Sequence, residues 1–411
     1  MDTAARLTCF QHGPAEGGSR PWACPECGAT LRPPPAADRK AFDLRENLGR
    51  RPNNIYRFPE LMPATGTPQV GIHTGGTPLM RADRLGNLLG IRRLYLKLDS
   101  HNWPTYSYKD RVVAAALQRA VDMGVTTVAC VSTGNVGNSL AALAAAAGLR
   151  AMVFYPSGVE AGKHAMNAAF NADVIQLNGS YDEVSAICRR LALEWESVAF
   201  VNITLRPYYA EGAKTVGFEI AEQLDWEQPD HVIVPAAGAA LLTRMTYGFE
   251  ELSELGLTSG GLLPRIHGAQ AAGCAPIANA FAAGNLTVRP EIPNTIATSI
   301  AIGNPTDGNE ALSVIRRSGG SARSVNDQEI LAGIELLAEK AGVFTEPAGG
   351  AAVALTRKLA AEKVISGDDL VVLVITGCGL KTQELTPPAL SRVVQLDADY
   401  AAVCAALAHA L

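Results

Sequence analysis

The sequence has no excess of positive charge and no long hydrophobic run. Its 35 Lys and Arg residues are outnumbered by 40 Asp and Glu residues, for a formal net charge of −5, so it offers no basic field for a polyphosphate strand. The most apolar stretch, SLAALAAAAGL, is too short and alanine-rich to span a bilayer, and the N-terminus turns polar too early for a secretory signal. We therefore expect a cytoplasmic protein that binds neither nucleic acid nor membrane.

Apolar residues, by contrast, make up 48% of the 411 positions, enough for a large core in two or three domains. From about residue 93, short β-branched runs alternate with longer Ala/Leu-rich stretches, as in RLYLKL, KDRVVAAALQRAV, TTVACV, NSLAALAAAAG and AMVFY. The alternation continues to the strand-like LVVLVIT. This pattern predicts parallel sheets covered by helices, and we expect two such α/β sheets in succession.

The first 35 residues form a separate segment marked by cysteine. Cys9-x2-His12 and Cys24-x2-Cys27 are separated by eleven residues and supply three thiolates and one imidazole, which suits a closed tetrahedral zinc site. Four ligands leave no open position for chemistry, so we expect a structural, zinc-ribbon-like module that folds on metal binding. The alternatives are a redox or chance cysteine pair with an unrelated His12, and a ribbon that has lost its metal.

Three predicted strands each run into a glycine-containing turn: STGN at 132–135, PAAGAA at 235–240 and TGCG at 376–379. In open α/β sheets, ligands gather at the carboxyl ends of strands. The first two turns also open helices, where free N–H groups favour a carboxylate or a phosphate. Taken singly, each turn could equally be a helix cap or a tight turn.

Lys109, in the segment SYKDR, stands where a strand and loop lead into a predicted helix. Burial and a nearby cationic group there would depress the pKa of its amine and make it a Schiff-base nucleophile. A solvated lysine in a first helical turn is the alternative when the segment is considered alone.

These motifs, in this order, resemble the tryptophan-synthase-β or type II family of pyridoxal 5'-phosphate (PLP) enzymes, and within it the threonine-synthase branch of plants and actinobacteria. The resemblance covers nearly the whole chain. It rests on GGTPL at 75–79, the Lys109 segment, STGN, PSGVEAGKHAMNAAFNADVIQLNGSYDEV, NITLRPYYAEGAKTVGFEIAEQL, GAQAAGCAPI, TIATSIAIGNP, TEPAGG and TGCGLKT.

The resemblance implies a two-domain type II PLP-enzyme fold, α/β throughout, that follows the zinc-ribbon-like module at 1–35. An N-terminal PLP domain would cover 36–215 and contain a mobile small subdomain at about 128–208. A C-terminal domain, 216–411, would carry the loop for the cofactor phosphate. A homodimer is also expected from the resemblance.

The resemblance also implies a role for each matching site residue. Lys109 would form the Schiff base with PLP, Asn135 would contact the 3'-oxygen of the cofactor, and Thr376 would meet its pyridine nitrogen. The cofactor phosphate would lie against Ala236, Ala237, Gly238, Ala239 and Ala240.

Substrate recognition is expected from residues that offer a cation, a hydroxyl or an amide near these motifs. The candidates are Ser132, Thr133, Asn138, Arg206 and Lys214. Arg206 is the preferred ligand for a substrate phosphate, and an ion pair at the surface or between domains is its alternative role.

The implied reaction converts O-phospho-L-homoserine and water to L-threonine and phosphate, with Lys109 moving protons at Cα and Cβ. A neutral Thr376 beside the ring would favour eliminations. The sequence departs from the family pattern at several positions: Trp103, Tyr108, Ala239, Ala240 and Cys378. These departures leave open a PLP enzyme for elimination or replacement at Cβ or Cγ of another amino acid. A non-catalytic zinc-binding interaction protein is a further alternative.

Overall fold

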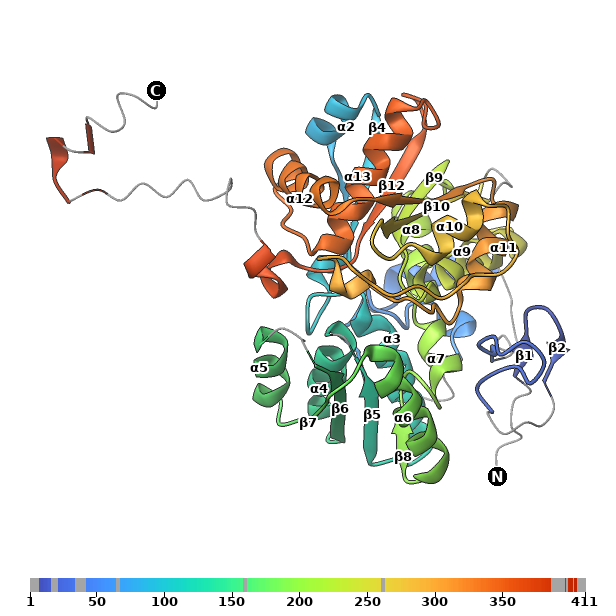
Figure 1. The fold of residues 1–411 in the computed structure, drawn as a ribbon. Helices are drawn as coiled ribbons and strands as arrows, with labels where there is room; N and C mark the ends of the chain where they lie inside the picture. The colour runs from blue at the N-terminus through green and yellow to red at the C-terminus, as the bar shows by residue number, and fades with distance from the viewer. Residues whose placement is uncertain are drawn as a thin grey trace.

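The computed structural model describes residues 7–15, 21–33, 42–63, 67–132, 134–157, 161–259, 263–385, 396, 398–401 and 403–404. Two sheets flanked by helices make up the molecule, one above the other in Figure 1. The predicted α/β alternation is confirmed, because RLYLKL forms β4 (Arg93–Leu98), TTVACV contains β5 (Thr127–Val131) and LVVLVIT contains β12 (Leu370–Ile375).

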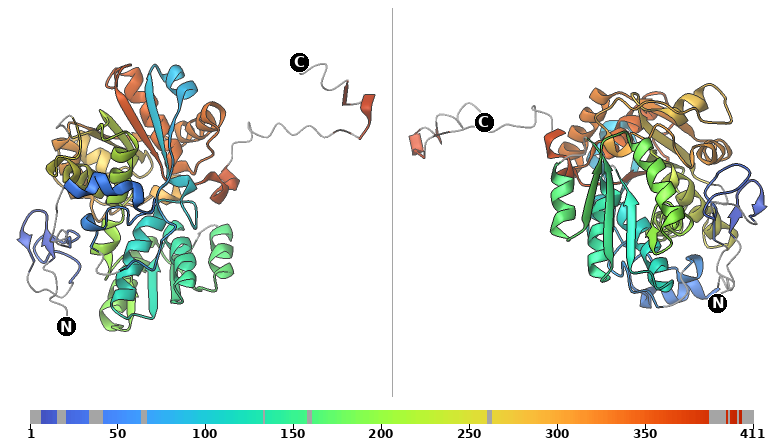
Figure 2. Two further views of the ribbon diagram at one scale, coloured as in Figure 1. Left: turned by 180° about the vertical axis from the view of Figure 1, so that it is seen from behind. Right: turned by 60° about the horizontal axis from the view of Figure 1, so that its bottom comes forward.

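The smaller sheet has four parallel strands in the order β7-β6-β5-β8, and we call residues 127–200 the small unit. Its other strands are β6 (Arg150–Pro156), β7 (Asp173–Leu177) and β8 (Val198–Phe200). The connecting helices are α4 (Asn135–Ala146), α5 (Ala161–Ala169) and α6 (Tyr181–Glu194). Figure 2 shows this sheet with its helices when the bottom of the molecule is turned forward.

The larger sheet has six strands in the order β11-β10-β9-β12-β4-β3, and we call this sheet with its helices the large unit. The strands not yet given are β3 (Leu79–Arg81), β9 (His231–Pro235), β10 (Arg265–Ala271) and β11 (Ser321–Val325). All neighbours are parallel except β3, which pairs antiparallel with β4 at the edge. Every residue of β9 and of β12 is buried, as expected for strands covered on both faces.

The two sheets are not formed in succession along the chain, so that prediction is wrong. β3 and β4 precede the small unit in sequence, yet β4 pairs with β12 from Arg93↔Leu370 to Leu98↔Ile375. An apolar run indicates that a strand is buried, but its partner is set by how the crossover helices pack. The alternation alone therefore could not show that the large sheet is interrupted.

The remaining helices surround the large sheet or join the two units. They are α1 (Phe42–Asn47), α2 (Asp83–Leu89), α3 (Lys109–Asp122), α7 (Arg206–Glu211), α8 (Lys214–Gln223), α9 (Ala240–Glu254), α10 (Pro276–Ala282), α11 (Gly308–Arg317), α12 (Asp327–Ala341) and α13 (Pro347–Ala361). Short 3-10 helices lie at Leu48–Arg50, Pro59–Leu61, Asp99–His101, Thr298–Ile300, Gly379–Lys381 and Gln383–Leu385. Within the described ranges, none of the helices combines the length and apolarity needed to span a membrane.

The N-terminal segment folds as a small module of its own. β1 (Thr8–Cys9) pairs antiparallel with β2 (Gly13–Pro14), and single bridges join Thr8 to Arg32 and Ala23 to Thr30. In Figure 1 the module lies beside α7, below α11 and next to the small unit. It is therefore placed where the two units meet.

Candidate active site

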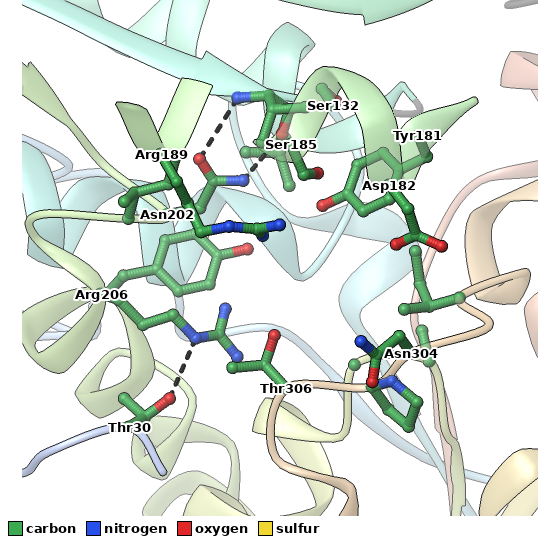
Figure 3. Close-up of a pocket in the computed structure, with 18 of the residues that line it drawn as sticks. Thr30, Ser132, Tyr181, Asp182, Ser185, Arg189, Asn202, Arg206, Asn304 and Thr306 are labelled. Atoms are coloured by element: carbon green, nitrogen blue, oxygen red, sulfur yellow. Dashed lines mark hydrogen bonds between the residues drawn. The ribbon is translucent and has the colours of Figure 1, made fainter. Parts of the chain in front are cut away.

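The three predicted ligand loops lie together at the carboxyl ends of β5, β9 and β12. They line an inner pocket of about 70 Å³ whose walls include Lys109, Asn135, Thr376 and residues 237–240. An outer pocket of about 640 Å³ adjoins it, and the two share Lys109, Asn135, Arg206, Tyr209, Ala237, Gly238 and Ser299. Figure 3 shows the outer pocket with part of its wall.

Lys109 is the first residue of α3, and its Nζ donates a hydrogen bond of 2.8 Å to the hydroxyl of Tyr108. Burial alone would lower the pKa of this amine, but the phenol oxygens of Tyr108 and Tyr209 outweigh burial and raise it. The prediction of a lowered pKa is therefore wrong for this arrangement. The groups beside the amine are phenols, where the sequence suggested a cation.

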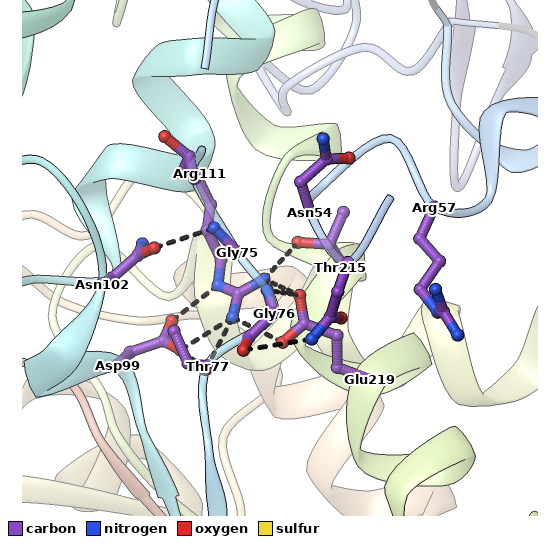
Figure 4. Close-up of polar contacts among 12 residues, drawn as sticks. Asn54, Arg57, Gly75, Gly76, Thr77, Asp99, Asn102, Arg111, Thr215 and Glu219 are labelled. Atoms are coloured by element: carbon purple, nitrogen blue, oxygen red, sulfur yellow. Dashed lines mark hydrogen bonds and ion pairs between the residues drawn. The ribbon is translucent and has the colours of Figure 1, made fainter. Parts of the chain in front are cut away.

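The first turn of α3 is anchored by Arg111, two residues beyond the lysine (Figure 4). The fully buried guanidinium donates to Asp99 Oδ2 at 2.8 Å and to Glu219 Oε1 at 2.5 Å. Lys97 Nζ contacts the other oxygen of Glu219 at 2.6 Å. Although burial raises the pKa of Glu219, Arg111 and Lys97 lower it well below its usual range. A fully paired buried network of this kind fixes its residues firmly, so it holds the helix start that carries Lys109.

Asn135 and Glu346 form a buried pair in the inner pocket. Asn135 Nδ2 donates to Glu346 Oε2 at 2.7 Å, whereas Asn135 Oδ1 and Glu346 Oε1 have no hydrogen-bond partner among the described residues. Buried polar atoms without partners are costly, and such atoms in a pocket suit a polar ligand. Sequence reasoning missed Glu346, although an acid directly before Pro347 at the start of α13 was a visible signal.

The loop after β9 presents backbone donors to the same pocket. Ala236 N–H belongs to the sheet, because it donates to Ala269 O at 2.8 Å. Ala239 adopts φ +71° as the N-cap of α9, and Ala240 begins the helix. The first N–H groups of a helix have no partner within it, so they remain available to an anion. Sequence reasoning noted the missing glycine at 239 but not that its backbone is left-handed.

Thr376 completes the inner pocket directly after β12. Its carbonyl accepts the Tyr108 N–H at 2.9 Å, and its residue is buried beside Lys109 in the pocket wall. An amine, a neutral hydroxyl, an amide–carboxylate pair and a helix N-terminus thus surround one small volume. These residues fit PLP, because they match its aldehyde, ring and phosphate.

Arg206 lies at the junction of the two pockets. Its Nη2 contacts Asp307 Oδ2 at 2.5 Å and its Nε donates to Thr30 Oγ1 at 3.2 Å. Burial would lower the pKa of the guanidinium, but Asp307 outweighs burial and raises it. Both expected roles, a pocket cation and an ion pair, therefore meet in this residue.

The other predicted substrate residues are placed differently. Ser132 lines the outer pocket, but its Oγ accepts the N–H groups of Gly134 and Gly137 at 2.9 and 3.0 Å, so it caps α4. Thr133 lies outside the described residues.

Asn138 and Lys214 line neither pocket. Asn138 Nδ2 donates to Asn167 Oδ1 at 2.8 Å. The Lys214 ammonium pairs with Glu211 at 2.6 Å and Glu251 at 3.0 Å. The structure therefore directs both side chains to other buried partners and not to a substrate.

Of the unusual aromatic residues near the lysine, only Tyr108 reaches a pocket wall. Trp103 and Tyr106 are 44% and 53% exposed and line neither pocket. Cys378 also lines neither. The expected reshaping of the wall beside Lys109 is thus limited to one phenol.

The outer pocket also has a wall that sequence reasoning missed. Tyr181, Ser185 and Arg189 line it from α6, and their spacing of four residues, which places them on one helix face, was the available signal. Ser185 Oγ is buried without a partner in the described structure, and Arg189 extends into the pocket in Figure 3. Trp22 and Thr30 of the N-terminal module line the same pocket.

The four predicted metal ligands converge. The ligand atoms of Cys9, His12, Cys24 and Cys27 all lie within 4.8 Å of one another. Burial raises the pKa of Cys24, but the backbone N–H groups of Cys27 and Glu26 outweigh it and bring the value to about 6. Burial and the neighbouring thiols raise the pKa of Cys27 to about 12. One thiolate thus opposes the next, and a central cation such as Zn²⁺ fits the set.

Comparison with known proteins agrees with this geometry. The family described as pyridoxal-phosphate dependent enzyme matches residues 70–377. Threonine synthase of Methanosarcina acetivorans is 40% identical over 87% of this chain and 87% of its own. The Methanocaldococcus jannaschii enzyme is 38% identical over 86% and 87%. Threonine synthase of Mycobacterium tuberculosis is 36% identical over 81% and 89%.

Solved structures with this fold share less sequence. Threonine deaminase isoform 2 from Solanum lycopersicum superimposes with a TM-score of 0.64 at 18% identity, covering 89% of this chain and 97% of that one. Maize serine racemase gives a TM-score of 0.63 at 20% identity, covering 92% and 100%. These two likenesses show the fold alone. The family match and the curated relatives together show that the chain belongs to the pyridoxal-phosphate-dependent enzymes, and within them to the threonine synthases.

Proposed function

We propose that this protein converts O-phospho-L-homoserine and water to L-threonine and phosphate. The observation that carries the proposal is the convergence of Lys109, Asn135, Thr376 and the 237–240 loop on one inner pocket. The curated relatives named threonine synthase support the choice of reaction.

When bound, PLP supplies an electron sink for charge that develops beside the amino group of a substrate. Lys109 is the one amine that lines the two described pockets. It is therefore the group that moves protons at Cα and Cβ. Because Tyr108 raises the pKa of the free amine, the phenol favours the protonated form from which a proton is donated.

Phosphate recognition falls to the outer pocket. Arg206 and Arg189 bring two cations to its wall, and the Ser185 hydroxyl adds a buried donor without a partner in the described structure. A phosphate dianion is held best by several such donors together. The Arg206–Asp307 pair at 2.5 Å keeps the guanidinium in place before substrate arrives.

The small unit, with the mobile portion at about 128–208, is proposed to close over the substrate. Asn135 and Ser185 reach the pockets from this unit, and Thr376 and Glu346 reach them from the large unit. Closure of one unit on the other would exclude water until it is needed for addition at Cβ.

Replacement of Arg206 tests the substrate assignment. Arg206→Gln is expected to raise KM for O-phospho-L-homoserine by about tenfold or more, since a bond between charged groups is lost. Arg190→Gln is the matched control, because Arg190 lies on the exposed face of α6 and pairs only with Glu194. Equal KM values for the two variants would contradict phosphate recognition by Arg206.

A second candidate is elimination or replacement on an unphosphorylated amino acid. The observation that favours it is Asp307, whose carboxylate already neutralises Arg206 and would repel a phosphate. Turnover of a panel of amino acids in the absence of phosphohomoserine activity would establish this alternative.

Assembly as a homodimer and a cytoplasmic location are further proposals, supported by the resemblance to the family. A structural zinc ion in the N-terminal module is supported by the four converging ligands. Sedimentation of the purified holoenzyme and its metal content per chain test the dimer and the zinc.

A further inference from the structure

The N-terminal module contacts the small unit through its first inner segment. Trp22 and Ala23 are buried in one apolar cluster with Val131, Phe154 and Phe200 of the small sheet. Trp22 is only 7% exposed although it lies on the surface of the outer pocket. The module is thus part of the small unit's core and not a free appendage.

The next segment of the module contacts the large unit. Thr30 Oγ1 donates to Asp307 Oδ1 at 2.7 Å and accepts from Arg206 Nε at 3.2 Å. Arg32 pairs with the buried carboxylate of Glu310 and stacks over the Tyr247 ring, 3.6 Å from its centroid. Thr30 therefore bridges the arginine proposed for substrate phosphate and the acid that holds it.

The predicted metal ligands lie between these two contact segments. Ala23 and Thr30 are bridged in antiparallel fashion, and Leu31 N–H donates to Trp22 O at 3.2 Å. The turn that joins them runs through Cys24 and Cys27, and Cys24 N–H donates to Ala29 O at 2.8 Å. Residues 22–32 thus form a loop whose closed end carries two metal ligands and whose sides contact opposite units. We call this loop the clasp.

We propose that the metal centre is a working part of the substrate site: it holds the clasp, which completes the outer pocket, joins the two units and positions Arg206 through Thr30. Loss of the metal releases the clasp and weakens substrate binding. The part that concerns substrate rests on the proposed function, whereas the coupling of the metal to α7 and α11 does not.

Thr30→Val tests the positioning role without touching a metal ligand. The holoenzyme variant is expected to keep its zinc and its visible PLP absorption, with KM for O-phospho-L-homoserine raised by about tenfold and kcat little changed. Thr30→Ser retains the hydroxyl and should restore the lower KM. Thr8→Val, in β1 of the same module, is the matched control.

Hydrogen exchange tests the coupling without any substrate. Removal of zinc from the PLP-loaded protein with a chelator is expected to increase exchange in the module and also in residues 202–211 and 304–310. Re-addition of Zn²⁺ should restore protection. Cys24→Ser should behave as the chelated protein does, provided that it folds.

Failures of the two proposals are distinguishable. If wild-type protein does not turn over O-phospho-L-homoserine, the proposed function fails and the exchange experiment still decides the clasp. If chelation changes exchange only within residues 7–33, or if Thr30→Val leaves KM unchanged, the clasp proposal is overturned even in an active threonine synthase.

Discussion

Asn135 Nδ2 donates to Glu346 Oε2 across 2.7 Å, and this bond joins the small unit to the large unit at the floor of the cofactor site. Asn135 begins α4, and Glu346 caps α13. Each keeps one buried oxygen without a partner among the described residues. The pair therefore serves both as a link between the units and as a set of polar groups for a ligand.

Replacement of Glu346 should weaken cofactor binding. Glu346→Ala leaves Asn135 without its partner in a buried pocket, so the Kd for PLP is expected to rise by about tenfold or more. Titration of the apoprotein with PLP, followed by visible absorption, measures this change. Glu254→Ala, at the exposed end of α9, is the control. Unchanged affinity in Glu346→Ala would show that the carboxylate has no part in the cofactor site.

The phosphate loop carries a strained alanine. Ala239 has φ +71°, a left-handed conformation that costs a residue with a Cβ about 1–2 kcal/mol. Ala239→Gly should relieve this strain and, after the added flexibility of the unfolded chain, raise the free energy of unfolding by about 0.5–1 kcal/mol. Urea denaturation measures the difference.

Ala240→Gly provides the opposite expectation one residue later. Ala240 is the first helical residue of α9, so glycine there should lower the free energy of unfolding by up to about 1 kcal/mol. Equal destabilisation by both substitutions would mean that position 239 is not strained.

Two buried histidines should make stability depend on pH. His231 Nδ1 lies 2.9 Å from His267 Nε2, and burial followed by the neighbouring His231 lowers the pKa of His267 to about 3. The folded protein keeps His267 neutral, whereas the unfolded chain takes up a proton below its ordinary pKa of 6.5. Its contribution is therefore complete above pH 6.5 and is lost as pH falls towards 3.

Between pH 7.5 and 5 this loss amounts to about 2 kcal/mol of unfolding free energy. His267→Gln should reduce that decrease in urea denaturation at the two pH values. His101→Gln, at an exposed position, should retain it. If the His267 variant shows the full decrease, the effect comes from other groups.

Long apolar runs were the part of the fold that the sequence predicted well. β4, β5 and β12 are buried, strongly apolar strands, and their pattern indicates a parallel sheet without any structure. The pairing of β4 with β12 could not be predicted, because 270 or more residues separate them and the small unit intervenes. Strand patterns report burial, whereas sheet order depends on packing between distant segments.

The site shows the same division. Asn135, the 237–240 loop and Thr376 were found because each follows a strand at a glycine-containing turn. Lys214 was chosen for its place in a motif, but only the structure shows its ammonium between two carboxylates. The bond between Arg206 and Thr30 joins residues 176 positions apart and leaves no mark in either local pattern.

The central claim is that Lys109 binds PLP in the inner pocket and serves the turnover of O-phospho-L-homoserine. The most direct test records the visible absorption spectrum of purified protein and of Lys109→Ala before and after this substrate is added, with assays for phosphate and threonine. The account predicts a Lys109-dependent band that changes on mixing, together with release of both products. A band that persists in Lys109→Ala, or wild-type protein with bound PLP that releases neither product, would contradict it.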